Sequence, residues 1–137
     1  MESASNIPRA EELFDLGQTE HASLFDLLGQ AWEVLPHIGD YLRDTLRAAQ
    51  LGQAHGQAVI EGDVFVGEGT VIEAGALIRG PVWIGRNCHI GHGATLRGNV
   101  IVGDGCIVGH AAELKNAVLF NSCEVPHFNY VGDSVLG

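Results

Sequence analysis

The chain has 137 residues, enough for one domain with a buried core but too few for two domains of ordinary size. Its 17 acidic and 7 basic side chains give a formal net charge of -10, which argues against binding nucleic acid or an anionic membrane because phosphates would be repelled. No apolar run is long enough to span a membrane, and the N-terminus lacks the basic start and apolar stretch of a signal peptide, so we expect a cytoplasmic protein.

The first 52 residues differ in character from the rest. Residues 1–20 are polar and acidic, and we expect them to form an N-terminal arm. Residues 21–52 carry two apolar stripes at helical spacing, which include Leu27 and Leu28, are separated by Pro36 and end at Gly52. This pattern predicts a helix–Pro–helix segment with one apolar side, which must cover another apolar surface.

From residue 53 to residue 137 the apolar period changes to six. Aliphatic residues recur at Ile60, Val66, Ile72, Ile78, Ile84, Ile90, Leu96, Val102, Val108 and Leu114. Small or β-branched residues stand two positions before nearly all of them, and turn-forming residues stand three positions after. This pattern predicts a solenoid of three-sided coils, each of about 18 residues, with parallel strands stacked on one another.

The series slips by one residue after Leu114. It resumes at Leu119, Val125, Val131 and Leu136. With this slip Cys88, Cys106 and Cys123 occupy one inward position on successive coils, whereas a strict period of six would bury Glu124 without a partner. We expect an interior file of reduced thiols, because parallel side chains on stacked strands rarely have the dihedral angle of a disulfide.

Three residues form a basic column on one outer face: Arg79, Arg97 and Lys115. Like charges one coil apart cost energy unless an opposite charge offsets them. The column therefore either binds an anion or pairs with acidic groups on a neighbouring subunit or on the helical segment.

The other two faces carry an apolar column and a histidine column. The apolar ridge consists of Phe65, Trp83, Ile101, Val118 and Val135. An unbroken apolar ridge is rarely left in water, so either the helical segment or a second chain must cover it.

The histidine column consists of His92, His110 and His127. Neutral imidazoles can bind metal, but no Asp, Glu or Cys stands beside them at ligand spacing, so we expect no metal. Hydrogen-bonded surface residues and a catalytic base remain as alternatives.

The six-residue code resembles that of the hexapeptide-repeat acyltransferases and of the nucleotidyltransferases with the same solenoid. The coil of that family is left-handed, so the resemblance implies a mainly β fold: a left-handed parallel β-helix after a short α-helical segment. Near the C-terminus, residues 113–115 (Glu-Leu-Lys) and 127–133 (His-Phe-Asn-Tyr-Val-Gly-Asp) resemble the glucosamine-1-phosphate N-acetyltransferase half of the bifunctional enzyme that makes UDP-N-acetylglucosamine.

This resemblance implies acetyl transfer from acetyl-CoA to an amino-sugar phosphate, with His127 as the general base. It implies contacts to the sugar phosphate by Arg97, Lys115 and Tyr130. It gives no role to Arg79, which is a substrate-binding candidate only through its place in the basic column. Three solenoids of that family pack in parallel, so we also expect a homotrimer.

The chain departs from this family in two ways. The uridylyltransferase half has no counterpart here, and we expect no nucleotidyl transfer. The repeat series stops one residue into a new hexad, so we expect a solenoid truncated at its C-terminal end, with the acetyl-CoA site beyond residue 137. The alternative function is a non-catalytic or regulatory β-helix assembly module, related to sugar-1-phosphate nucleotidyltransferases of the UDP-N-acetylglucosamine diphosphorylase type.

Overall fold

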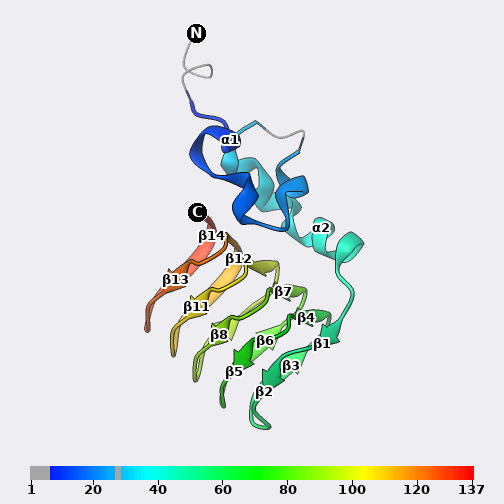
Figure 1. Cartoon of the computed structure of the whole chain (residues 1–137), viewed down its shortest axis with the longest axis vertical. Helices are drawn as coiled ribbons and strands as arrows, with labels where there is room; N and C mark the ends of the chain where they lie inside the picture. Colours follow the sequence, from blue (N-terminus) through cyan, green and yellow to red (C-terminus); the bar gives the residue numbers. More distant parts are fainter. Residues whose placement is uncertain (1–6, 27–28) are drawn as a thin grey trace.

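A computed structural model describes residues 7–26 and 29–137, and it places a group of short helices beside one end of a stack of short strands (Figure 1). Residues 1–6 of the expected arm and Leu27 and Leu28 of the first apolar stripe lie outside the described residues. None of the helices in the described ranges is long and apolar enough to cross a membrane.

The strands form a parallel solenoid of about five turns, in which each side of the coil stacks on the same side of the next. The basic face consists of β3 (Val59–Glu61), β6 (Leu77–Arg79), β9 (Thr95–Leu96) and the first halves of β12 (Glu113–Leu119) and β14 (Tyr130–Leu136). The ridge face consists of β1 (Ala49–Gln50), β4 (Val64–Val66), β7 (Val82–Ile84), β10 (Val100–Val102) and the second halves of β12 and β14. The histidine face consists of β2 (Gln53–Ala54), β5 (Val71–Ile72), β8 (His89–Ile90), β11 (Ile107–Val108) and β13 (Glu124–Val125).

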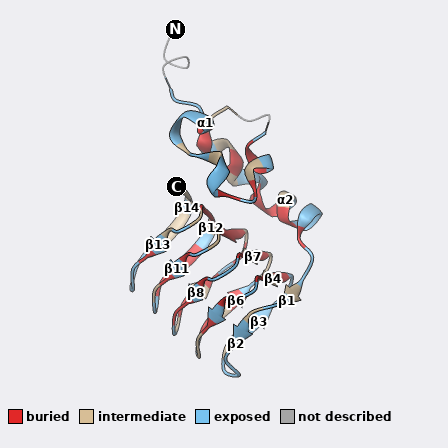
Figure 2. Cartoon of the chain, in the orientation of Figure 1, coloured by how far each residue is buried: buried red, intermediate tan, exposed pale blue. Residues whose placement is uncertain are grey.

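The aliphatic series lies inside the solenoid. Pairing in register places Ile78 beside Leu96 and Leu96 beside Leu114, and all three side chains are fully buried. Figure 2 shows this alternation of buried and exposed residues along the coils. The structure therefore confirms the mainly β parallel solenoid and the short helical segment before it.

The one-residue slip in the aliphatic series corresponds to a corner, between Leu114 and Leu119, that is one residue shorter than the others. β12 continues through it without a break, with a positive φ of 48° at Asn116, and pairs Leu114 with Val131 and Leu119 with Leu136. The corner therefore joins the basic face and the ridge face into one sheet.

The three cysteines form the predicted interior file. Cys88 and Cys106 are buried, Cys123 is partly buried against the same core, and all three thiols are free. The thiols donate to carbonyls of the next coil, with Sγ–O distances of 3.0 Å from Cys88, 3.1 Å from Cys106 and 3.6 Å from Cys123.

The helical segment is more broken than its periodicity predicts. It contains the 3₁₀ turns η3 (Ala22–Phe25) and η4 (Ala31–His37) and the helix α2 (Ile38–Thr45). The expected arm before it also contains α1 (Ala10–Leu13) and the 3₁₀ turn η2 (Leu16–Gln18), so from here on the helical segment means residues 10–46. Pro36 lies inside η4, where its missing N–H and fixed φ favour a short turn over a continuous α-helix. β1 then begins at Ala49, inside the range that the periodicity assigns to the helical segment.

The helical segment covers the apolar ridge of its own chain. Ile101 and Val118 of the ridge are fully buried in one apolar cluster with residues of the segment. Phe120 packs between Phe14 and Phe25, with ring centroids 5.0 Å and 5.6 Å away. Of the two alternatives for the ridge, the structure shows the helical segment, so the ridge no longer supports the expected homotrimer.

Candidate functional site

The basic column lies along one edge of the basic face. Leu96 pairs with Ile78 on one side and with Leu114 on the other. Because Arg79, Arg97 and Lys115 each follow one of these paired residues, they stand at the same position on three successive coils, as predicted.

Two of the three cations are already paired. Arg79 Nε lies 3.1 Å from Glu61 Oε1, and Arg97 Nη1 lies 2.6 Å from Glu113 Oε2. The Glu113 carboxylate raises the pKa of Arg97, so the guanidinium stays charged. Both acids lie on the basic face itself, whereas the pairing alternative placed them on the helical segment or on a neighbouring subunit. Each pair is half-exposed, so solvent screens it and it contributes little to stability.

Lys115 differs from the two arginines. Within residues 7–26 and 29–137, no carboxylate lies within ion-pair distance of its ammonium. It pairs in register with Gly132, which has no side chain, and the Tyr130 hydroxyl lies over Gly132. The ammonium of Lys115 and the phenol of Tyr130 are therefore donors on adjacent strands, a combination that suits a phosphate or carboxylate.

His127 lies at the corner between β13 and β14. Its ring stacks on that of His110, with centroids 4.8 Å apart and planes 8° apart, and Phe128 meets both rings edge-on. The third member of the histidine column, His92, is held separately, with Nδ1 2.5 Å from the carbonyl oxygen of Ala74. Among the described His, Cys, Asp and Glu residues, no group of three or more is placed to hold a metal ion.

The structure therefore brings only some of the predicted site residues together. Lys115 and Tyr130 lie close together on the last two coils, and His127 stands at the corner three residues before Tyr130. Five residue steps, at most about 18 Å, separate His127 from Gly132, the register partner of Lys115, so a substrate that contacts both His127 and Lys115 must reach along the basic face. Arg79 lies two coils away and is held by Glu61.

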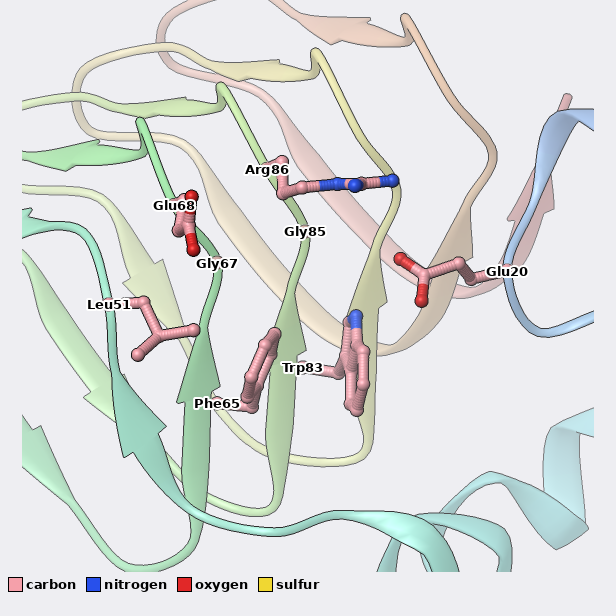
Figure 3. Close-up of a pocket in the computed structure, with 8 residues that line it drawn as sticks. All are labelled: Glu20, Leu51, Phe65, Gly67, Glu68, Trp83, Gly85 and Arg86. Atoms are coloured by element: carbon pink, nitrogen blue, oxygen red, sulfur yellow. The ribbon is translucent and has the colours of Figure 1, made fainter.

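The sequence interpretation missed a cavity of about 280 Å³ between the helical segment and the ridge face (Figure 3). Its lining consists of Glu20, Leu51, Phe65, Gly67, Glu68, Trp83, Gly85 and Arg86. Phe65 and Trp83 stack with centroids 4.2 Å apart, and the Arg86 guanidinium donates to Asp104. The glycines that follow the ridge strands at positions 67 and 85 gave no signal for this cavity, because a Cβ there would meet the backbone of the next coil at 2.7 Å and 3.0 Å. No residue of the predicted site lines this cavity.

The comparisons with known proteins agree with the fold. A family model described as the GMPPB C-terminal domain matches residues 78–137, which hold every predicted site residue. A search of the curated proteins finds no match. These coils are therefore similar to a sugar nucleotidyltransferase-related domain of the left-handed β-helix type.

Proposed function

We propose that the last two coils bind an amino-sugar phosphate and that this chain serves as an acyl-CoA-dependent N-acetyltransferase in nucleotide-sugar biosynthesis. The observation that carries the proposal is Lys115, whose ammonium has no carboxylate partner among the described residues and whose register partner, Gly132, lies under the Tyr130 hydroxyl. The motif at residues 127–133 and the sugar nucleotidyltransferase-related match give further support.

The residues suit the chemistry of acetyl transfer. The substrate amine attacks the thioester carbonyl, a C–N bond forms, the C–S bond breaks, and the departing thiolate of coenzyme A takes up a proton. The amine must lose a proton in this reaction, and the exposed imidazole of His127 can accept it. Lys115 supplies charge to the substrate phosphate and Tyr130 donates its hydroxyl, while Arg97 would have to share its guanidinium with Glu113. We assign the acetyl-CoA site to no described residue.

Binding of the sugar phosphate can be tested alone. We expect glucosamine 1-phosphate to bind the 137-residue chain in calorimetry, and Lys115→Ala to weaken binding about tenfold or more because one charge-assisted hydrogen bond is lost. Arg86→Gln is the matched control, since Arg86 is also a surface cation but is paired with Asp104 on the ridge side. Equal affinities of the wild-type and Lys115→Ala chains would contradict the proposed site.

The catalytic role of His127 needs a rate measurement. We expect His127→Ala to lower the rate of acetyl transfer from acetyl-CoA about 100-fold or more, with little change in KM for the sugar phosphate. His92→Ala is the control, because His92 is bound to Ala74 away from the last coils. Full activity of His127→Ala would exclude it as the base. Absence of binding by both the sugar phosphate and acetyl-CoA would favour the non-catalytic assembly module.

A further inference from the structure

The first coil of the solenoid ends in unpaired strand edges. β1, β2 and β3 each pair with one strand of the second coil, and no described strand lies on their other side. The N–H groups of Gln53 and Val59 donate to the second coil. Because successive residues of a strand direct their backbone groups to opposite edges, those of Ala54 and Ile60 point away from the solenoid.

The interior of the solenoid is also uncovered at this end, which we call the open end (residues 49–60). Ile60 is 38% exposed, whereas Ile78 and Leu96, which hold the same position on the next two coils, are both 0% exposed. Ala54 is exposed, whereas Ile72 above it is buried. The helices lie beside the opposite end of the stack (Figure 1), so they leave this surface free.

The open end lacks the devices that usually protect strand edges. Residues 48–60 are the longest stretch of the chain without Asp, Glu, Lys or Arg, in a protein of net charge -10, and they contain no proline. Charged residues and proline are the common means by which edge strands avoid pairing with other chains. A hollow of about 420 Å³, lined in part by Ala54, Val71 and Ile72 and also by His55 and Glu73, continues this surface onto the histidine face.

We propose that the open end binds the open end of a second copy of this chain. The surface presents three strand edges along the sides of a triangle, and a partner that satisfies all three must present the same arrangement. A two-fold axis perpendicular to the solenoid axis provides this arrangement, because facing strands of the two copies then run antiparallel. One side of the triangle pairs with the same side of the partner, and each of the other two sides pairs with the other one in the partner. The missing charges remove the repulsion that two copies of this acidic chain would otherwise meet, and the interface closes at two copies.

The test is the mass of the wild-type chain in solution, measured by sedimentation across a range of concentrations. We expect two copies joined through the open end, and Ile60→Lys to weaken the association about tenfold or more because it places charges against the partner's edge. Ile107→Lys is the matched control, since Ile107 is an exposed isoleucine on a coil far from the open end. A trimer through another surface would appear as six copies in the wild type and three in Ile60→Lys.

A second variant guards against loss of folding. Ala54→Pro removes an N–H that points away from the solenoid, so the coil should remain folded by circular dichroism while association is lost. A wild-type chain that sediments as a single copy at every concentration would overturn the proposal. So would undiminished association in folded Ile60→Lys and Ala54→Pro chains. This test does not depend on the sugar-phosphate site.

Discussion

At the scale of single residues, His21 occupies an unusual environment between the helical segment, to which it belongs, and the ridge face. Its Nδ1 lies 2.6 Å from the Tyr41 hydroxyl, and its ring meets Trp83 edge-on with centroids 4.6 Å apart. Nε2 is buried and has no hydrogen-bond partner in the part of the chain that the structure describes. Burial lowers the pKa of His21 from 6.5 to about 4, against a smaller opposing effect of Asp104.

This shift predicts that acid weakens the fold. The unfolded chain binds a proton at His21 near pH 6.5, whereas the folded chain does so only near pH 4. The contribution of neutral His21 to the free energy of unfolding is therefore complete above pH 6.5 and is lost as the pH falls toward 4. The total loss is about 3 kcal/mol. Urea unfolding of the wild type and of His21→Phe measures it, because the carboxylates titrate in both chains and only the wild type titrates His21. Parallel pH profiles of the two chains would contradict the assignment.

The aromatic residues after β12 and β13 allow a matched comparison of burial. Phe120 is buried between Phe14 and Phe25, whereas Phe128 is 73% exposed at its corner. We expect Phe120→Ala to lower the free energy of unfolding by about 3–5 kcal/mol and Phe128→Ala by less than about 0.5 kcal/mol. Chemical denaturation checks both, and a similar cost for the two variants would mean that the helical segment does not pack on β12 as described.

At the scale of elements, the corners between strands limit which side chains fit. A Cβ on Gly109 would lie 2.6 Å from the backbone nitrogen of His127, whereas a Cβ on Gly93 would meet only Ala111, at 3.8 Å. The coils therefore stack backbone to backbone at Gly109 and leave space at Gly93.

We expect Gly109→Ala to destabilise the solenoid by about 1–3 kcal/mol, because neither backbone can move without disturbing its coil. Gly93→Ala should cost less, about 0.5–1 kcal/mol, because its only penalty is a positive φ of 72°. Equilibrium unfolding in urea compares the two. A larger loss for Gly93→Ala would show that backbone strain rather than coil spacing limits the corners.

The elements also show how far the sequence predicts this structure. The solenoid, its shortened corner and the cysteine file follow from the six-residue period, because each inward position is repeated on every coil. The helical segment is less predictable, since its short turns depend on packing against ridge residues far away in the sequence. Glu61 stands 18 residues before Arg79, so that ion pair was open to prediction, whereas the pairing of Arg97 with Glu113 requires the side-chain geometry.

At the scale of the whole molecule, neighbouring coils stabilise one another, so coils with neighbours on both sides should open least often. β7 and β10 each pair with two strands, whereas β2 and β3 each pair with one. We expect the slowest amide hydrogen exchange in residues 82–84 and 100–102, and much faster exchange in residues 53–54 and 59–61 of the Ile60→Lys chain. Uniform protection in that chain would instead indicate a single cooperative unit.

The docking of the helical segment affects how the chain can fold during synthesis. Residues 10–46 leave the ribosome before the solenoid, yet the surface that buries Ile38 and Leu42 includes Ile101, Val118 and Phe120, which are made much later. Until β10 and β12 have stacked, the apolar sides of these helices have nothing to pack against and are open to chaperones or aggregation. Folding must therefore start within the solenoid, and residues 10–46, although translated before the solenoid, reach their final place after it.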